Sequence, residues 1–392
     1  MKQTDKAKAR TAPDWVLAGS VVALCALGLM MVYSTTFAMG YRNFGDASHF
    51  FDRQFLWFAI GLVLLVGTAL VNYRHLTKVS ILAMLVALGL LVAVVARPEG
   101  NGRLLFGNSV SPVECAKLAV IIYIAHWLAS KKADQLRKLP VGLLPFTIIV
   151  GIVVALVMAQ PDISEAVVIV LVAVAMFFLA GADLMQFAVG IVGGIAAFVL
   201  VVKRMPQALE RLQPFWDSWR DPLSSTNFQL KQGIIALGSG GLFGLGPGNG
   251  RMSHQWLPAA YTDSIFAIVG EELGLLGSLM LILLFGLFAY RGFLLIRRTR
   301  DPFGRLLAAG IACWISFQTL INLAVVTNTI PFTGIALPFV SLGGSSLVFC
   351  MVGAGILLSI SREPANAEVS ESETAGVRWG HGRTRIPSPL GN

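Results

Sequence analysis

The sequence has 392 residues, of which 56% are hydrophobic and 13% are charged, and its mean hydropathy is +0.73. These values exclude an ordinary soluble globular protein, in which about a quarter of the residues are charged. The formal net charge is +9, but no basic patch interleaved with aromatic residues indicates a nucleic acid partner. The composition predicts a multi-pass membrane protein whose basic loops contact anionic lipid headgroups.

Apolar stretches long enough for a helix to cross about 30 Å of hydrocarbon recur along the chain. A membrane-embedded backbone must satisfy its own hydrogen bonds, and the alternating pattern of an outer-membrane barrel is absent, so we expect an all-α fold. We predict about ten transmembrane helices, near residues 15–36, 54–71, 79–96, 113–129, 140–159, 165–181, 184–202, 264–290, 304–327 and 343–361.

The charged residues predict the orientation and the domain organisation. Lysine and arginine gather in alternate short loops, which are expected to be cytoplasmic. With an even number of helices both termini are then cytoplasmic, and "YTDS" faces the outside. We predict a cytoplasmic segment at 1–14, one membrane domain at 15–361 that includes a large extracytoplasmic loop at 203–263 between helices seven and eight, and a disordered cytoplasmic tail at 362–392.

The extracytoplasmic loop begins with the amphipathic stretch "MPQALERLQPFWDSWRDP". Its apolar side chains fit the headgroup level of the membrane, while its charged side chains fit water. Both an interfacial helix and an ordinary loop helix packed on the bundle remain open.

The motif "PVECAKLAV" places Glu114 and Lys117 three residues apart at the start of a predicted transmembrane helix, so they share a helix face. Ionised groups at this depth face protein or a water-filled cavity, and each is the natural partner of the other. The pair either fixes helix packing as a salt bridge, or forms a site in which Lys117 attracts an anionic substrate and Glu114 holds it in place.

In "MAQPDISEA", Pro161 interrupts a helix and leaves Asp162 and Glu165 at the external end of the next one. Asp162 either caps a tight turn or belongs to a binding site. The sequence leaves both interpretations open.

The run "GSGGLFGLGPGNG", at 238–250, contains enough glycine for backbone N–H groups to approach an anion such as a pyrophosphate. It lacks the Gly-Lys-Ser/Thr of a nucleotide-binding P-loop and follows no predicted strand, so we expect no ATP or NAD site. An anion-binding nest and simple loop flexibility both remain open.

The segment "LPAAYTDSIFAIVGEELG" puts Asp263, Glu271 and Glu272 at the mouth of an apolar helix. If the helix begins near Ser264, Asp263 lies at the water boundary, Glu271 lies within roughly 80° of it around the helix axis, and Glu272 points to the far side. Asp263 is either a helix-capping acid or a general base with an open approach.

A second uncharged stretch, "NTIPFTGIALPFVSLGGSS" at 328–346, is hydrophobic for a loop. Such backbone is tolerated near the membrane when it is buried in protein or lines a cavity, so we expect it to wall a site. No metal-ligand spacing is found among the histidines and cysteines, and Ser/His/Asp hydrolase motifs are absent.

Together, "SPVECAKLA", "QPDISEA", "LPAAYTDSIFAIVGEELG" and "IPFTGIALPFVSLGGSS" resemble the SEDS family (shape, elongation, division and sporulation), the RodA/FtsW/SpoVE group of bacterial cell-wall polymerases. The resemblance runs from Asp14 to the tenth predicted helix. It implies ten helices with both termini inside and a large external loop between helices seven and eight, in a bacterial plasma membrane.

The resemblance also implies a peptidoglycan glycosyltransferase that polymerises lipid II outside the membrane, for cell elongation or division, with a class B penicillin-binding transpeptidase as partner. The essential aspartate of the family's Thr-Asp motif corresponds to Asp263. The expected substrate-binding residues are Glu114 and Lys117 of the Pro-Ser-Glu-x-x-Lys stretch, Asp162 of the Gln-Pro-Asp motif, Thr262 beside Asp263, and Ser345 in the uncharged stretch.

The chain departs from the family pattern at several positions. Similar proteins have Lys, Glu and His where this chain has Ser253, Ala259 and Tyr261, and Gly-Thr where it has Ser164 and Glu165. Gln-Pro-Ser-Glu has become "SPVE". These changes remove polar groups near the expected centre.

The expected reaction has Asp263 take the proton from an acceptor sugar hydroxyl while polyprenyl pyrophosphate leaves the donor, with inversion. The leaving group needs positive charge, for which Lys117, loop arginines and a divalent cation (Mg²⁺ or Mn²⁺) are the candidates; the sequence does not show which. A lipid-linked precursor flippase and a non-catalytic scaffold for a transpeptidase remain the alternatives.

Overall fold

The computed structural model describes residues 12–96, 111–160, 162–183, 185–186, 188–190, 192–194, 215–218, 227–252 and 257–363. Within these ranges every regular element is a helix, which confirms the all-α fold class. Seven helices are long and apolar enough to cross a membrane: α1 (Trp15–Phe44), α2 (His49–Leu70), η1 with α3 (Tyr73–His75 and Leu76–Val95), α4 (Pro112–Ala129), α13 (Ile265–Arg298), α14 (Pro302–Val326) and α15 (Gly344–Ser361). The chain is therefore a multi-pass membrane protein.

Four further helices whose bounds fall within the described ranges are shorter. Two of them are apolar, α6 (Leu143–Met158) and α7 (Ile163–Leu179), and the others are α5 (Ala133–Leu136) and α11 (Phe228–Ser239). Of the predicted helix at 184–202 the structure describes residues 185–186, 188–190 and 192–194, and of the loop at 203–263 it describes 215–218, 227–252 and 257–263. The count of ten, the placement of the loop, the amphipathic helix within it and the domain boundaries accordingly stay predictions.

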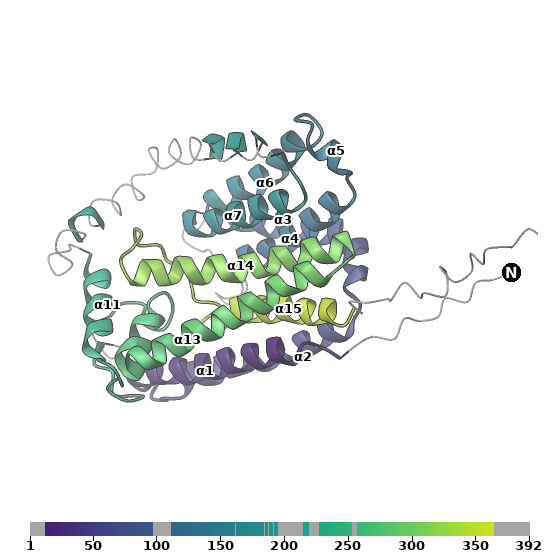
Figure 1. Ribbon diagram of the computed structural model, residues 1–392. Helices are drawn as coiled ribbons and strands as arrows, with labels where there is room; N and C mark the ends of the chain where they lie inside the picture. The colour runs from purple at the N-terminus through teal and green to yellow at the C-terminus, as the bar shows by residue number, and fades with distance from the viewer. Residues whose placement is uncertain are drawn as a thin grey trace, which may run out of the picture.

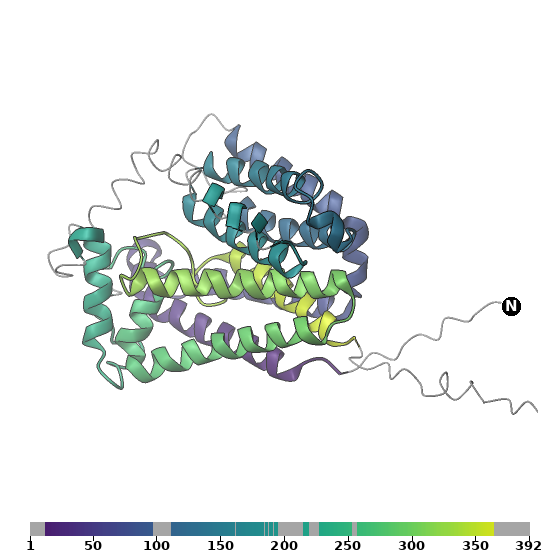
Figure 2. The ribbon, with the colours of Figure 1, turned by 45° about the horizontal axis from the view of Figure 1, so that its top comes forward.

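The long helices run side by side, and α11 lies across one end of the bundle (Figures 1 and 2). Most residues of α4, α14 and α15 are buried, whereas α2 and α3 expose much of their apolar surface. Because a bilayer rather than water surrounds such a bundle, exposed apolar faces are expected where helices contact lipid. Polar side chains accordingly concentrate on the inner helices, where protein groups can satisfy them.

The beginning of α1 and the end of α15 meet at the same end of the bundle. The Asp14 carboxylate caps α1 by accepting from the Val16 and Leu17 amides, and Arg291 of α13 pairs with it at 2.7 Å. Although burial acts to raise the pKa of Asp14, the hydrogen bonds from Arg291 and from these amides bring it below its ordinary value. The Asp14 N–H donates to Ser361 Oγ at 3.1 Å, which agrees with two termini on one side of the membrane. Which side that is stays a prediction.

Helix α13 is broken at Gly274, whose φ of 68° and ψ of −165° are not helical. The glycine-rich segment at 238–252 supplies partners for the backbone groups on both sides of the break. Leu245 and Gly246 donate to the carbonyls of residues 271 and 272, and the amides of residues 275 and 276 donate to the carbonyls of residues 241 and 242. The part of α13 before Gly274 is thus connected to a loop rather than continued with the rest as one rod.

Candidate functional site

Asp263 lies in a turn immediately before α13, and α13 begins at the end of the bundle that α11 crosses (Figure 1). The N-cap of α13 is Ser264, so Asp263 is not the capping residue. The Asp263 side chain is partly exposed, and its Oδ2 lies 3.0 Å from the point where a Cβ on Gly334 would be. Gly334 is itself exposed. The carboxylate therefore lies against the backbone of a second segment, at a place open to the outside of the protein.

Three consecutive carbonyl groups leading to Asp263 each accept a hydrogen bond, two from that second segment and one from α14. The Leu342 amide donates to the Tyr261 carbonyl at 2.8 Å, and Ser341 Oγ donates to the Thr262 carbonyl at 2.6 Å. Asn322 Nδ2 of α14 donates to the Asp263 carbonyl at 2.8 Å. The uncharged stretch at 328–346 thus packs directly on the Thr-Asp motif, which is the position expected of a wall of the site.

The backbone around Asp263 holds three non-glycine residues in the left-handed region. They are Ala259 with φ of 51°, Asn328 with φ of 57° and Phe339 with φ of 64°. Each such residue costs about 1–3 kcal/mol unless its surroundings hold it. All three belong to the two segments that meet at Asp263, and strain of this kind is typical of sites where geometry has been fixed for a function.

The other two carboxylates of the opening segment of α13 have a structural role. Glu271 accepts from the Arg251 amide at 2.7 Å and from the Met252 amide at 3.2 Å. Glu272 accepts from Ser34 Oγ at 2.7 and 2.6 Å and from the Gly248 amide at 3.2 Å. Both side chains are fully buried. The amides of the glycine-rich loop bind carboxyl groups, and the groups that fill it are these two glutamates.

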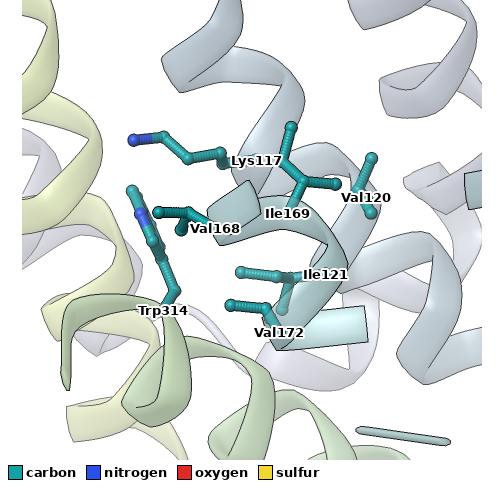
Figure 3. Close-up of a pocket in the computed structure, with 7 residues that line it drawn as sticks. All are labelled: Lys117, Val120, Ile121, Val168, Ile169, Val172 and Trp314. Carbon is teal, nitrogen blue, oxygen red and sulfur yellow. The ribbon is translucent and has the colours of Figure 1, made fainter. Parts of the chain in front are cut away.

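Lys117 lies in a buried cluster that connects three helices. Its Nζ is 2.9 Å from Glu114 Oε2, as the sequence predicted, and 2.8 Å from Glu165 Oε2 of α7. It also donates to Gln318 Oε1 of α14 at 2.8 Å, and the Trp314 ring lies 5.2 Å from it. The Lys117 side chain is 1% exposed. Figure 3 shows its stem along a small apolar cavity, with the nitrogen directed away from the valine and isoleucine side chains that line the rest of it.

Gln318 and Asn322 connect this cluster with the Asp263 turn. They lie four residues apart on α14, which is about 6 Å along the helix axis. Gln318 Nε2 donates to the Ala336 carbonyl at 3.0 Å, and Asn322 Nδ2 donates to the Ile335 carbonyl at 2.7 Å. One face of α14 therefore holds the lysine cluster, the loop and the Asp263 backbone together.

The remaining predicted site residues are Asp162, Thr262 and Ser345. Asp162 is the N-cap residue of α7, with a partly exposed side chain that makes no capping hydrogen bond to the helix. Thr262 Oγ1 donates to the Ala259 carbonyl at 3.2 Å, and buried Ser345 Oγ accepts from the Ser111 amide at 3.1 Å.

Three residues that connect the helices and loops of the site were not predicted as site residues from the sequence: Glu165, Gln318 and Asn322. A signal was present for the last two, because Trp314, Gln318 and Asn322 repeat every four residues along one face of an apolar helix. The pairing of Glu165 with Lys117 depends on how α4 and α7 approach each other, which a single sequence does not specify.

Among the described residues, no three or more histidine, cysteine, aspartate or glutamate side chains form a cluster that could hold a metal ion. The carboxylates of Asp263 and Asp162 are suitable donors for a hard divalent cation, but such an ion prefers six or more oxygen ligands. A cation in this region would need most of its ligands from phosphate oxygens and water.

Residues 15–366 match the model of the FtsW/RodA/SpoVE family, described as cell cycle protein. The chain belongs to this family. It is 36% identical over 363 residues to stage V sporulation protein E of Bacillus subtilis, which covers 90% of this chain and 98% of that protein. It is also 36% identical over 358 residues to the probable peptidoglycan glycosyltransferase FtsW of Trichlorobacter lovleyi, which covers 89% of this chain and 93% of that protein.

Solved structures of family members have the same fold. A chain from a peptidoglycan synthase complex that coordinates polymerization and crosslinking superimposes with a TM-score of 0.71 at 26% identity, covering 90% of this chain and 98% of that one. The rod shape determining protein RodA of Thermus thermophilus superimposes with a TM-score of 0.63 at 24% identity, covering 90% of this chain and 97% of that one. These coverages leave no large part of either solved chain without a counterpart here.

Proposed function

We propose that this chain is an inverting peptidoglycan glycosyltransferase that polymerises lipid II into glycan strands at the outer face of the plasma membrane. Membership of the FtsW/RodA/SpoVE family over residues 15–366 and the names of its relatives support this activity. The observation that carries the mechanism is the state of Asp263. It is a partly exposed carboxylate on a backbone fixed by three hydrogen bonds, while Glu271 and Glu272 are fully used by the glycine-rich loop.

In the proposed reaction, the Asp263 carboxylate accepts the proton of an acceptor sugar hydroxyl as that oxygen attacks the anomeric carbon of the donor. The bond from this carbon to the pyrophosphate oxygen breaks, and its electron pair leaves with the polyprenyl pyrophosphate. Attack from the side opposite the leaving group gives inversion. A base positioned in this way contributes about 10²- to 10⁴-fold to the rate.

Glu114, Lys117, Asp162, Thr262 and Ser345 are the proposed substrate-binding residues. Because two carboxylates surround the Lys117 ammonium, the cluster supplies no net positive charge of its own. We therefore assign neutralisation of the leaving pyrophosphate to a loop arginine or to a divalent cation shared with its phosphates. Arg251 is a candidate, because its side chain is exposed while Glu271 holds its backbone amide.

We further propose a class B penicillin-binding transpeptidase as the partner, lipid II and its polyprenyl-linked glycan as ligands, and an orientation with both termini cytoplasmic. The synthase complex among the solved structures supports a partner that crosslinks the strands. The relatives include stage V sporulation protein E and rod shape determining protein RodA, and we propose that the strands serve cell elongation or division.

The test uses purified protein with and without the transpeptidase, supplied with lipid II. The parent is expected to make glycan strands, and Asp263→Asn is expected to lose at least about 100-fold in rate while unfolding at the parental temperature. Asp263→Asn with the parental rate would remove the base assignment. Movement of lipid II across vesicles without any glycan product would favour the flippase, and strand synthesis only by an added polymerase would favour the scaffold.

A further inference from the structure

One buried side chain that bonds to the Asp263 backbone, Asn322, has no role in the proposed reaction. Asn322 is 1% exposed, and its Nδ2 donates both to the Asp263 carbonyl at 2.8 Å and to the Ile335 carbonyl at 2.7 Å. Two carbonyl acceptors at these distances require the NH₂ group on this side of the amide, which fixes its orientation. Asn322 therefore links the residue before α13 to the loop that contains Gly334.

The two linked segments are the ones that define where the Asp263 carboxylate lies. Its main chain is held through the carbonyl that Asn322 binds, and its Oδ2 lies against Gly334, one residue before Ile335. A change in the distance between the two carbonyls would thus move the carboxylate relative to the surface it lies against. The Asn322 amide is bonded directly to both carbonyls, in addition to the Ser341 and Leu342 bonds that join the same two segments.

The chemistry of Asn322 is poorly explained by packing alone. Its Oδ1 is buried and has no hydrogen-bond donor within the described part of the chain. A buried acceptor without a partner is unfavourable, and an apolar side chain of similar size would avoid it. The two donated bonds are what an apolar residue cannot supply.

We propose that Asn322 is a positioning residue for Asp263, which holds the Thr-Asp turn and the loop at 328–343 at the separation needed for proton transfer from the acceptor sugar. The inference rests on the proposed function, because it assigns Asp263 as the base. Asn322 acts through the Asp263 backbone and has no contact with the reacting atoms. Gln318, one turn earlier, makes the equivalent bond to Ala336 but serves the Lys117 cluster instead.

The test compares Asn322→Ala, which removes both donors, with Asn322→Asp, which keeps the size and presents oxygen to both carbonyls. Thr319→Val is the matched control. Thr319 is 3% exposed on the same helix, and its hydroxyl donates within α14 to the Ile315 carbonyl at 2.8 Å. Each variant is assayed with its transpeptidase for lipid II polymerisation across a range of pH, and its thermal unfolding is followed in the same detergent.

For Asn322→Ala we expect kcat to fall about 10- to 100-fold with KM for lipid II nearly unchanged, because small displacements of a catalytic group have effects of this size. The pH at which the rate is half-maximal on its acid side should also move, since a displaced carboxylate has different burial and neighbours. Asn322→Asp should be at least as impaired, and Thr319→Val should match the parent in all three measurements.

Two results would overturn the inference. One is a parental kcat for Asn322→Ala. The other is a reduced rate with an unshifted pH profile, which is the signature of less folded enzyme. Asp263→Asn, measured in parallel, separates the two proposals: if it is inactive while Asn322→Ala is normal, only the positioning role fails, and if it is fully active, the base assignment fails independently of Asn322.

Discussion

Removing the charge of Lys117 should damage folding before it reveals anything about catalysis. The ammonium lies 2.9 and 2.8 Å from two carboxylate oxygens on different helices, and all three side chains are buried. At an effective dielectric constant of about 20, each contact is worth roughly 6 kcal/mol of Coulomb attraction before desolvation is subtracted. In Lys117→Met the two carboxylates would face each other without a cation.

Loss of one partner from a buried ion pair costs about 3–5 kcal/mol, which is a large part of the roughly 5–15 kcal/mol that stabilises a folded domain. We therefore expect Lys117→Met to unfold at a clearly lower temperature than the parent. The triple variant Lys117→Met, Glu114→Gln, Glu165→Gln removes all three charges, and it should recover most of that loss because neutral replacements of buried ionic groups are often tolerated.

Thermal unfolding in detergent and lipid II polymerisation per folded molecule are the two assays. A stable but inactive triple variant would show that the reaction needs the cluster, and a stable and active one would assign it to packing. Glu165→Gln alone is the control, since it leaves one ammonium with one carboxylate and should cost clearly less stability than Lys117→Met. Parental stability of Lys117→Met, or a triple variant no more stable than it, would refute the reasoning.

In a thermal unfolding assay, Gly244→Ala should destabilise the protein by about 3 kcal/mol, because φ is 82° and the new Cβ would meet the Glu272 carbonyl at 2.1 Å. Gly241 has a φ of 57° but open space around it, so Gly241→Ala should cost only about 1 kcal/mol. Gly334→Ala should lower kcat about tenfold by crowding the Asp263 carboxylate, and an unchanged kcat would contradict that contact. Asp14→Asn should cost up to about 1 kcal/mol near neutral pH, because asparagine still caps α1 but loses the charge that pairs with Arg291. Because the pKa of Asp14 is lowered by folding, this difference should be present above its ordinary pKa of 3.8 and shrink as the pH falls through the lower folded value; a difference that grew in acid would contradict the Arg291 pairing.

Composition and the length of the apolar stretches were sufficient for the all-α fold class, because a lipid-embedded backbone has few alternatives. The Glu114–Lys117 pair also followed from spacing, since both residues lie on one helix. The break at Gly274 did not, because the apolar run continues through it and the loop that bonds to it is distant in sequence.

The candidate site, like the fold, was predictable from the sequence only in part. The four ordered motifs led to the family and to Asp263, but spacing alone did not separate Asp263 from its two acidic neighbours. The structure separates them by their partners, because the amides that bind Glu271 and Glu272 come from residues 248–252. Contacts between helices, such as Glu165 with Lys117 and Asn322 with Asp263, need the packing of the bundle, which no single segment encodes.

The interruption at Gly274 has a mechanical consequence for an enzyme that works at a fluid boundary. The 24 residues from Leu275 to Arg298 are long enough to cross the hydrocarbon layer on their own. A thicker or thinner bilayer changes the tilt of such a segment, and because the helix is interrupted at Gly274, the part that begins at Ile265 need not tilt with it as one rod. Strand synthesis should consequently vary little between vesicles of short and long acyl chains, and a steep dependence on chain length would show that the two parts of the helix move as one.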